Sequence, residues 1–222
     1  ATGFAQGTKE FFRIGDSGKR NDGLFLDVFS FGAGIGLGPK NWKRITPCRQ
    51  NVIDPCVIAA DQNYRVTLSL LLAAEANPNA KDINGQTPVH LAALDGYTET
   101  VTQLLDHGGD IEAKTSWGAT PLSAAAARGR TSTVAALLLR KAEVDPKTDA
   151  GWTPLFAALV GKYKGSAQFL RNNGADIHIV TGAGNTLLHA AASSGMDEWI
   201  VELLDAGLLI NAEDGGGRTP LD

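Results

Sequence analysis

A motif that returns at one constant interval is the feature that most constrains the fold of this chain. The dipeptide Thr-Pro, or its variant Thr-Leu, recurs without slippage at Thr87, Thr120, Thr153, Thr186 and Thr219. A glycine stands two residues before each of these threonines, at Gly85, Gly118, Gly151, Gly184 and Gly217. A fixed period of about 33 residues indicates a stack of similar units, each of which buries its apolar face against the next.

Each unit contains the signals of two short helices. A threonine hydroxyl can cap a free backbone N–H, and proline fits the first helical position, where its own N–H would be unpaired. The first helix is expected to end nine residues later at a left-handed glycine, as at Gly96, Gly129 and Gly195. A second helix with apolar residues at helical spacing follows. It is expected to end at Gly108, Gly174 and Gly207.

These motifs resemble the ankyrin repeat. The resemblance implies an all-α repeat solenoid in which helix-turn-helix units alternate with β-hairpin loops, over residues 48–222. It implies a divergent first repeat, four full repeats from about residue 82 and the start of a sixth at 214. His90 and His189 occupy the histidine position of the motif Thr-Pro-Leu-His, so their rings are expected to bond neighbouring hairpins.

Some positions depart from the pattern. Glu75 and Lys141 stand where other copies end the second helix with glycine. Each would cost about 1 kcal/mol if the left-handed conformation is kept. In the fourth copy Gly161 comes one position early and Lys162 takes its place, so a reshaped turn is expected there.

Residues 1–47 do not follow the period. The stretch "GLFLDVFSFGAGIGLGPK" alternates large and small residues, which predicts an extended glycine-rich strand that caps the first repeat. A phosphate-binding loop is disfavoured because Pro39 and Asn41 flank Lys40 where such a loop needs Gly and Ser or Thr.

Composition and charge restrict the function classes. The net charge of −4 argues against a nucleic-acid partner, and no apolar run approaches the ~20 residues that span a bilayer. Residues 1–50 hold eight basic against four acidic residues, and the remainder holds twelve against twenty. Cys48 and Cys56 fit no zinc pattern, and two unpaired thiols are favoured over a disulfide. We therefore expect an intracellular, cytoplasmic protein without a metal or a cofactor.

The resemblance implies a protein–protein interaction scaffold that binds its partner on a concave groove and has no catalytic activity. No nucleophile motif accompanies the histidines, which agrees with this expectation. Binding residues are sought where the repeat leaves the residue type free, with weight on Trp, Tyr and Arg. The candidates are Asp95, Tyr97, Trp117, Arg128, Arg130, Asp149, Trp152 and Tyr163. Trp117 and Trp152 stand on adjacent hairpins and are expected to form one aromatic patch, although Trp152 also suits packing on its neighbour.

Two alternatives stay open. One is a small-molecule or enzymatic site between the N-terminal segment and the concave face, because pockets often form where structural units meet. The other is a regulatory or targeting fragment of a larger protein, because the sequence stops after "RTPLD" inside a repeat. An uncapped last repeat would expose Trp199, Ile200 and Leu203 and favour self-association.

Overall fold

A computed structural model describes residues 54–222 of the chain. The strand predicted within residues 1–47 and the thiol of Cys48 lie outside the described residues. The described part holds ten α-helices in five pairs. The pairs are α2 (Pro55–Asp61) with α3 (Arg65–Ala73), α4 (Pro88–Asp95) with α5 (Thr98–Asp106), α6 (Pro121–Ala127) with α7 (Thr131–Leu139), α8 (Pro154–Val160) with α9 (Lys164–Asn172), and α10 (Leu187–Ser194) with α11 (Asp197–Asp205).

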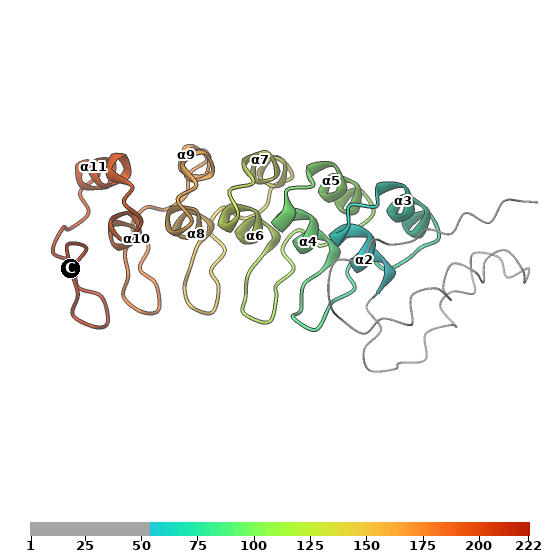
Figure 1. Cartoon of the computed structure of the whole chain (residues 1–222), viewed down its shortest axis with the longest axis horizontal. Helices are drawn as coiled ribbons and strands as arrows, with labels where there is room; N and C mark the ends of the chain where they lie inside the picture. The colour runs from blue at the N-terminus through green and yellow to red at the C-terminus, as the bar shows by residue number, and fades with distance from the viewer. Residues whose placement is uncertain (1–53) are drawn as a thin grey trace, which may run out of the picture. The chain divides into compact units, whose positions relative to one another are not determined.

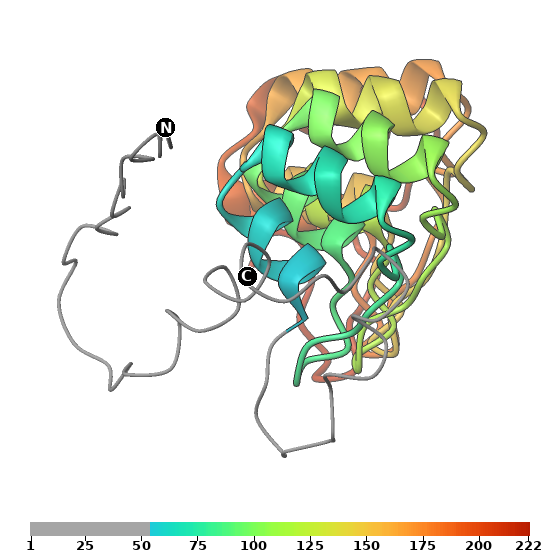
Figure 2. The same ribbon diagram turned by 90° about the vertical axis from the view of Figure 1, so that its right-hand side faces the viewer.

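The helices form two parallel rows, and this confirms the all-helical repeat solenoid. The first helices of the pairs lie in one row and the second helices in the other, with long loops projecting beyond the first row (Figure 1). A view down the stack shows the pairs superimposed, with the loops on one side of both rows (Figure 2). Among residues 54–222 the loops form no regular strand, only an isolated bridge between Val180 and Thr186. None of the helices in this part is long and apolar enough to cross a membrane.

Side-chain caps begin the first helices as the sequence predicts. The hydroxyls of Thr120 and Thr153 each accept a hydrogen bond of 3.3 Å from the backbone N–H three residues later. Asp54 stands where later repeats have threonine, and its carboxylate accepts the N–H of Cys56 at 2.8 Å. The divergent first repeat therefore keeps a helix cap by using a different side chain. Cys56 itself is a buried free thiol.

The motif histidines connect one repeat to the next, which confirms the expected role. The backbone N–H of Thr87 donates to Nδ1 of His90 at 3.2 Å, so this nitrogen is the acceptor. The proton therefore sits on Nε2, which donates to the carbonyl of Ala119 in the next hairpin at 3.0 Å. His189 makes the equivalent bond to the carbonyl of Arg218 at 3.1 Å.

Left-handed residues end the helices at the expected positions. Gly96, Gly129 and Gly195 have φ of 83°, 66° and 65° after the first helices. Lys141 adopts φ of 64° in place of glycine, so the left-handed turn is kept there despite the steric cost of its Cβ. The expected reshaping of the fourth turn is wrong, because Lys162 takes φ of 63° while Gly161 stays right-handed.

The loop tips are fastened to one another by backbone hydrogen bonds. In each case an N–H of one tip donates to a carbonyl of the preceding tip, in the repeat before it. The four bonds are Ser116 to Asn84 (3.0 Å), Asp149 to Trp117 (3.1 Å), Gly182 to Ala150 (2.9 Å) and Gly215 to Ala183 (2.8 Å). Successive loops are thus held in one register, and their side chains point from fixed positions.

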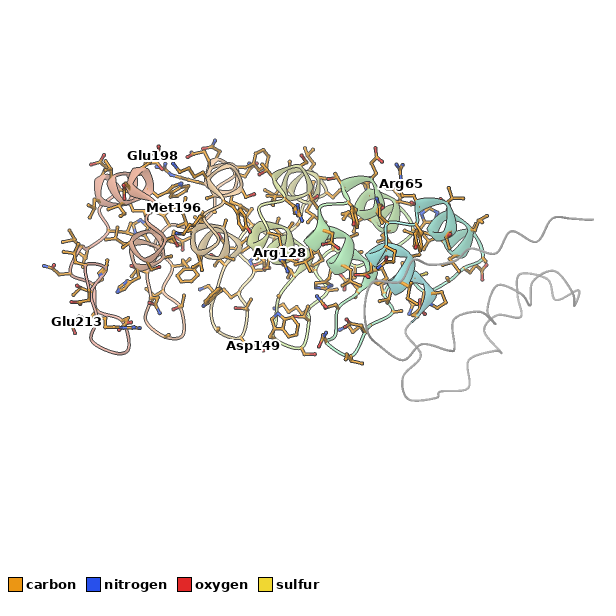
Figure 3. The ribbon with its side chains drawn as sticks, in the orientation of Figure 1. Arg65, Arg128, Asp149, Met196, Glu198 and Glu213 are labelled. Carbon is orange, nitrogen blue, oxygen red and sulfur yellow. The ribbon has the colours of Figure 1, made fainter. Side chains whose placement is uncertain are left out.

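Ion pairs link consecutive second helices along the outer row. They join Arg65 to Glu99, Asp106 to Arg140, Lys164 to Glu198 and Arg171 to Glu202. Figure 3 shows Arg65 and Glu198 on this row, away from the loops. Because these pairs are solvent-exposed, each contributes little to stability.

Replacing Lys141 by glycine is expected to stabilise the protein. A left-handed residue with a Cβ costs roughly 1–2 kcal/mol, and glycine removes part of this cost. We expect Lys141→Gly to raise the free energy of unfolding by about 1 kcal/mol in urea denaturation. Lys141→Ala is the matched control, because it removes the charge and keeps the Cβ. An equal gain from both substitutions would show that backbone strain is not the cause.

The stability of the protein is expected to fall as the pH drops below about 6.5 because of His90. Burial lowers the pKa of His90, so below about pH 6.5 the unfolded chain binds a proton that the native ring resists. The contribution is complete above the unfolded pKa and is lost as the pH falls toward the lowered folded pKa. His90→Gln should flatten the pH dependence of urea midpoints. The same pH dependence in His90→Gln and in the unsubstituted protein would show that His90 is not its cause.

Candidate binding face

The structure sorts the predicted binding residues into three places. Trp117, Asp149 and Trp152 lie on the loops, and Asp95 and Arg128 lie at the ends of α4 and α6. Figure 3 shows Arg128 at the level of the first helices and Asp149 beyond it at a loop tip. We call the surface formed by the loop tips and the ends of the first helices the concave face. The remaining candidates, Tyr97, Arg130 and Tyr163, lie in the turns between paired helices.

Tyr97 and Tyr163 are half-buried in the turns of the solenoid, whereas Arg130 is exposed and lies over a neighbouring turn. The ring of Tyr163 lies so close to Gly129 that no Cβ would fit there. Arg130 covers Gly96 in the same way, and its Nε donates to the carbonyl of Leu94 at 3.2 Å. A structural role for these three residues could have been predicted from the sequence, because they hold the same position in successive repeats. Their contacts hold neighbouring turns together.

The two tryptophans are partly exposed on adjacent loops. Trp117 is 47% exposed and Trp152 is 39% exposed. Trp152 also packs on Phe156, with ring centroids 4.9 Å apart and planes inclined by 55°. Trp152 therefore packs on Phe156 and keeps part of its surface available to a partner. Phe156 was missed from the sequence, although it stands where the second and fifth repeats have histidine.

A groove of about 560 Å³ lies beside Trp152 on the concave face. Trp152, Phe156 and Val160 form its apolar side. Asn185 and Ser193 of the fifth repeat contribute smaller polar side chains, and the last loop contributes Arg218. Val160, Asn185, Ser193 and Arg218 were not among the predicted residues. Asn185 and Arg218 could have been identified from the sequence, because they occupy the repeat position of Trp152 in the two units that follow it.

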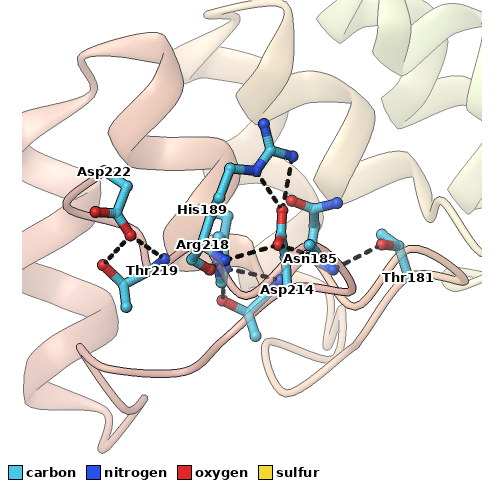
Figure 4. Close-up of polar contacts among 9 residues, drawn as sticks. Thr181, Asn185, His189, Asp214, Arg218, Thr219 and Asp222 are labelled. Carbon is cyan, nitrogen blue, oxygen red and sulfur yellow. Dashed lines mark hydrogen bonds and ion pairs between the residues drawn. The ribbon is translucent and has the colours of Figure 1, made fainter.

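Arg218 is held in place at the end of the groove by Asp214. Its Nε and Nη2 donate to Oδ2 of Asp214 at 3.0 and 2.7 Å, as Figure 4 shows. The backbone N–H groups of Gly216 and Arg218 donate to Oδ1 at 2.8 and 3.0 Å. The guanidinium and these backbone donors lower the pKa of Asp214 to about 2. The last loop therefore presents a paired, oriented arginine to the groove.

The described residues offer little for metal or nucleophilic chemistry. No group of three His, Cys, Asp or Glu side chains within residues 54–222 can hold a metal ion. His90 and His189 are committed to hairpin bonds, and Nδ1 of His107 bonds the carbonyl of Gln103 at 2.8 Å. The concave face presents partly exposed aromatic rings, a groove and charged side chains.

Comparison with known proteins agrees with this architecture. A family model described as ankyrin repeats (3 copies) matches residues 56–148 and 100–181. No curated protein matches the chain. Repeats of this family generally mediate protein–protein interaction. The family model spans more than half of the chain, and the helical pairs of the structure follow the same repeating unit. The protein therefore belongs to the ankyrin-repeat family.

Proposed function

We propose that this protein is an intracellular scaffold that binds a partner protein on the concave face of its third to fifth repeats, without catalytic activity of its own. The observation that carries the proposal is the pair of partly exposed tryptophans beside a groove. Tryptophan and arginine dominate binding energetics because they bury a large area and keep a polar handle. Trp117, Trp152 and Arg128 therefore form the centre of the proposed site.

The rigidity of the loops supports this proposal. The bond between the N–H of Asp149 and the carbonyl of Trp117 joins the two loops that carry the tryptophans. A surface fixed in this way loses little conformational entropy when a partner docks. Asp95 and Asp149 are proposed to form the polar rim. Tyr97, Arg130 and Tyr163 are proposed to support the site through the turns between the helices.

Self-association through the last repeat is a second proposal, as the sequence suggested. The expected exposure of Trp199 and Leu203 is wrong, because both are buried within the repeat, whereas Leu209 and Leu221 are about three-quarters exposed. Exposed apolar side chains of this size favour association. The alternative site involving residues 1–47 falls outside the described residues and stays a prediction.

Substitution of the central pair tests the main proposal. We expect Trp117→Ala combined with Arg128→Ala to abolish capture of the partner, since both proposed anchors are lost. Partner recovery on immobilised protein would be quantified by mass spectrometry, and circular dichroism should remain native.

The matched control is Leu139→Ala combined with Arg140→Ala, which removes an exposed apolar and a basic side chain from the outer row of the same repeat. This control should capture the partner normally. Equal recovery with the concave and the outer double variants would reject the assigned site.

A further inference from the structure

Arg128 differs from the other arginines of the described part in having no partner there. Arg65, Arg140, Arg171 and Arg218 each pair with an acidic side chain, and Arg130 donates to a backbone carbonyl. Arg128 is exposed at the end of α6, and its side chain makes no hydrogen bond or ion pair with residues 54–222. A guanidinium presents five N–H donors in a planar fork that matches a carboxylate. Arg128 therefore offers these donors to an anion of a partner on the concave face.

The nearby aromatic side chains add further donors. The indole N–H groups of Trp117 and Trp152 make no hydrogen bond within the described residues. An indole nitrogen can only donate. A partner that satisfies Arg128 and these indoles must supply acceptors, such as carboxylate and backbone carbonyl oxygens. An extended peptide segment supplies both.

The surrounding charges limit how acidic that segment can be. Asp95 precedes Arg128 by one repeat, and the carboxylate of Asp149 lies against Gly118 on the third loop. These two acidic residues would repel additional carboxylates on either side of the one that pairs with Arg128. The geometry thus favours a single acidic residue over an acidic run.

The groove beside Trp152 supplies the second contact. Its side made of Trp152, Phe156 and Val160 is apolar, and small side chains of the fifth repeat leave space opposite. A large apolar side chain of the partner can bury itself there, as anchor residues do at the centre of interfaces. Asn185, which also lines the groove, offers amide groups to the backbone of the same segment.

The distance between the two contacts sets a spacing in the partner. Arg128 belongs to the third repeat, and Val160, on the side of the groove nearer to Arg128, ends the first helix of the fourth, so Arg128 and this side of the groove lie one repeat apart. Adjacent packed helices are separated by about 10 Å. An extended chain advances about 3.3 Å per residue, so roughly three residues cover this distance.

Accepting the proposed function, we infer that the recognised partner is an extended peptide segment with one acidic residue about three positions from an aromatic or large aliphatic residue. The acidic side chain pairs with Arg128. The apolar side chain occupies the groove beside Trp152. The segment lies along the stack of repeats, across the third to fifth loops.

Labelled synthetic peptides test this inference with the full chain. The probes are Gly/Ser peptides that carry Asp-Gly-Ser-Trp or its reverse, measured by fluorescence anisotropy up to about 1 mM. Matched peptides replace Asp with Lys, replace Trp with Ser, or place Asp next to Trp. We expect at least one orientation to bind about tenfold or more tightly than its three matched peptides. Absence of binding by every peptide would overturn the inference.

A charge reversal assigns the anion contact to Arg128. With Arg128→Glu, the Lys peptide should bind more tightly than the Asp peptide. Arg65→Glu makes the same charge change on the outer row and should keep the original preference. Equal responses of the two variants would overturn the assignment. Circular dichroism of each variant establishes that it is folded.

Two further probes identify the source of the anion. A phosphoserine peptide that binds more tightly than the Asp peptide, and depends on Arg128 in the same way, would support anion recognition and point to a phosphorylated segment. A labelled single-stranded oligonucleotide that competes at the same site and binds more tightly than any peptide would overturn the inference. If Trp117→Ala with Arg128→Ala abolishes partner capture but peptides show no acidic preference, the proposed function survives and only this inference fails.

Discussion

Close contact between the first helices is the constraint on which the rest of this structure depends. Ala92, Ala125, Ala158 and Ala191 are fully buried and hold one position in four successive repeats. A side chain without atoms beyond Cβ lets two helix backbones approach closely, whereas a larger residue would separate the repeats. The leucines of the second helices fill the wider space behind them, with Leu104, Leu137 and Leu170 fully buried. Stacking at this distance brings each loop within hydrogen-bonding reach of the next.

The loop register follows from that distance and determines what the concave face can present. Backbone hydrogen bonds of 2.8 to 3.1 Å join successive tips, so this register does not depend on the side chains at the tips. The glycines next to the tips are required by the same packing, since at Gly184 a Cβ would lie 2.6 Å from the backbone nitrogen of Gly215. Residues that recur therefore build the solenoid, and residues that do not recur, such as Trp117 and Arg128, differentiate its surface.

The features predicted correctly from the sequence are those that depend on local chemistry. Threonine caps, left-handed glycines and the histidine bonds depend on a few neighbouring atoms repeated in every unit, and the structure confirms them. The turn at Lys162 was predicted wrongly, because the sequence puts glycine one position early, whereas the structure keeps the left-handed conformation at the repeat's usual position, on Lys162. The groove was not predicted either. It is lined by residues of separate repeats, such as Phe156 of the fourth and Asn185 of the fifth, and this juxtaposition depends on how the repeats stack.

The arginines of the described part differ in whether their charge is paired. Along the outer row, each described arginine and Lys164 meets an acidic residue of an adjacent helix or turn, so the pairs satisfy one another within the chain. On the concave face, Arg218 is neutralised by the buried carboxylate of Asp214. Arg128 has no such partner among residues 54–222, although the chain carries more acidic than basic residues. In an acidic protein, an unpaired arginine attracts an anionic group of a ligand, whereas the surrounding acidic side chains repel it. This arrangement favours recognition of a single carboxylate at the arginine.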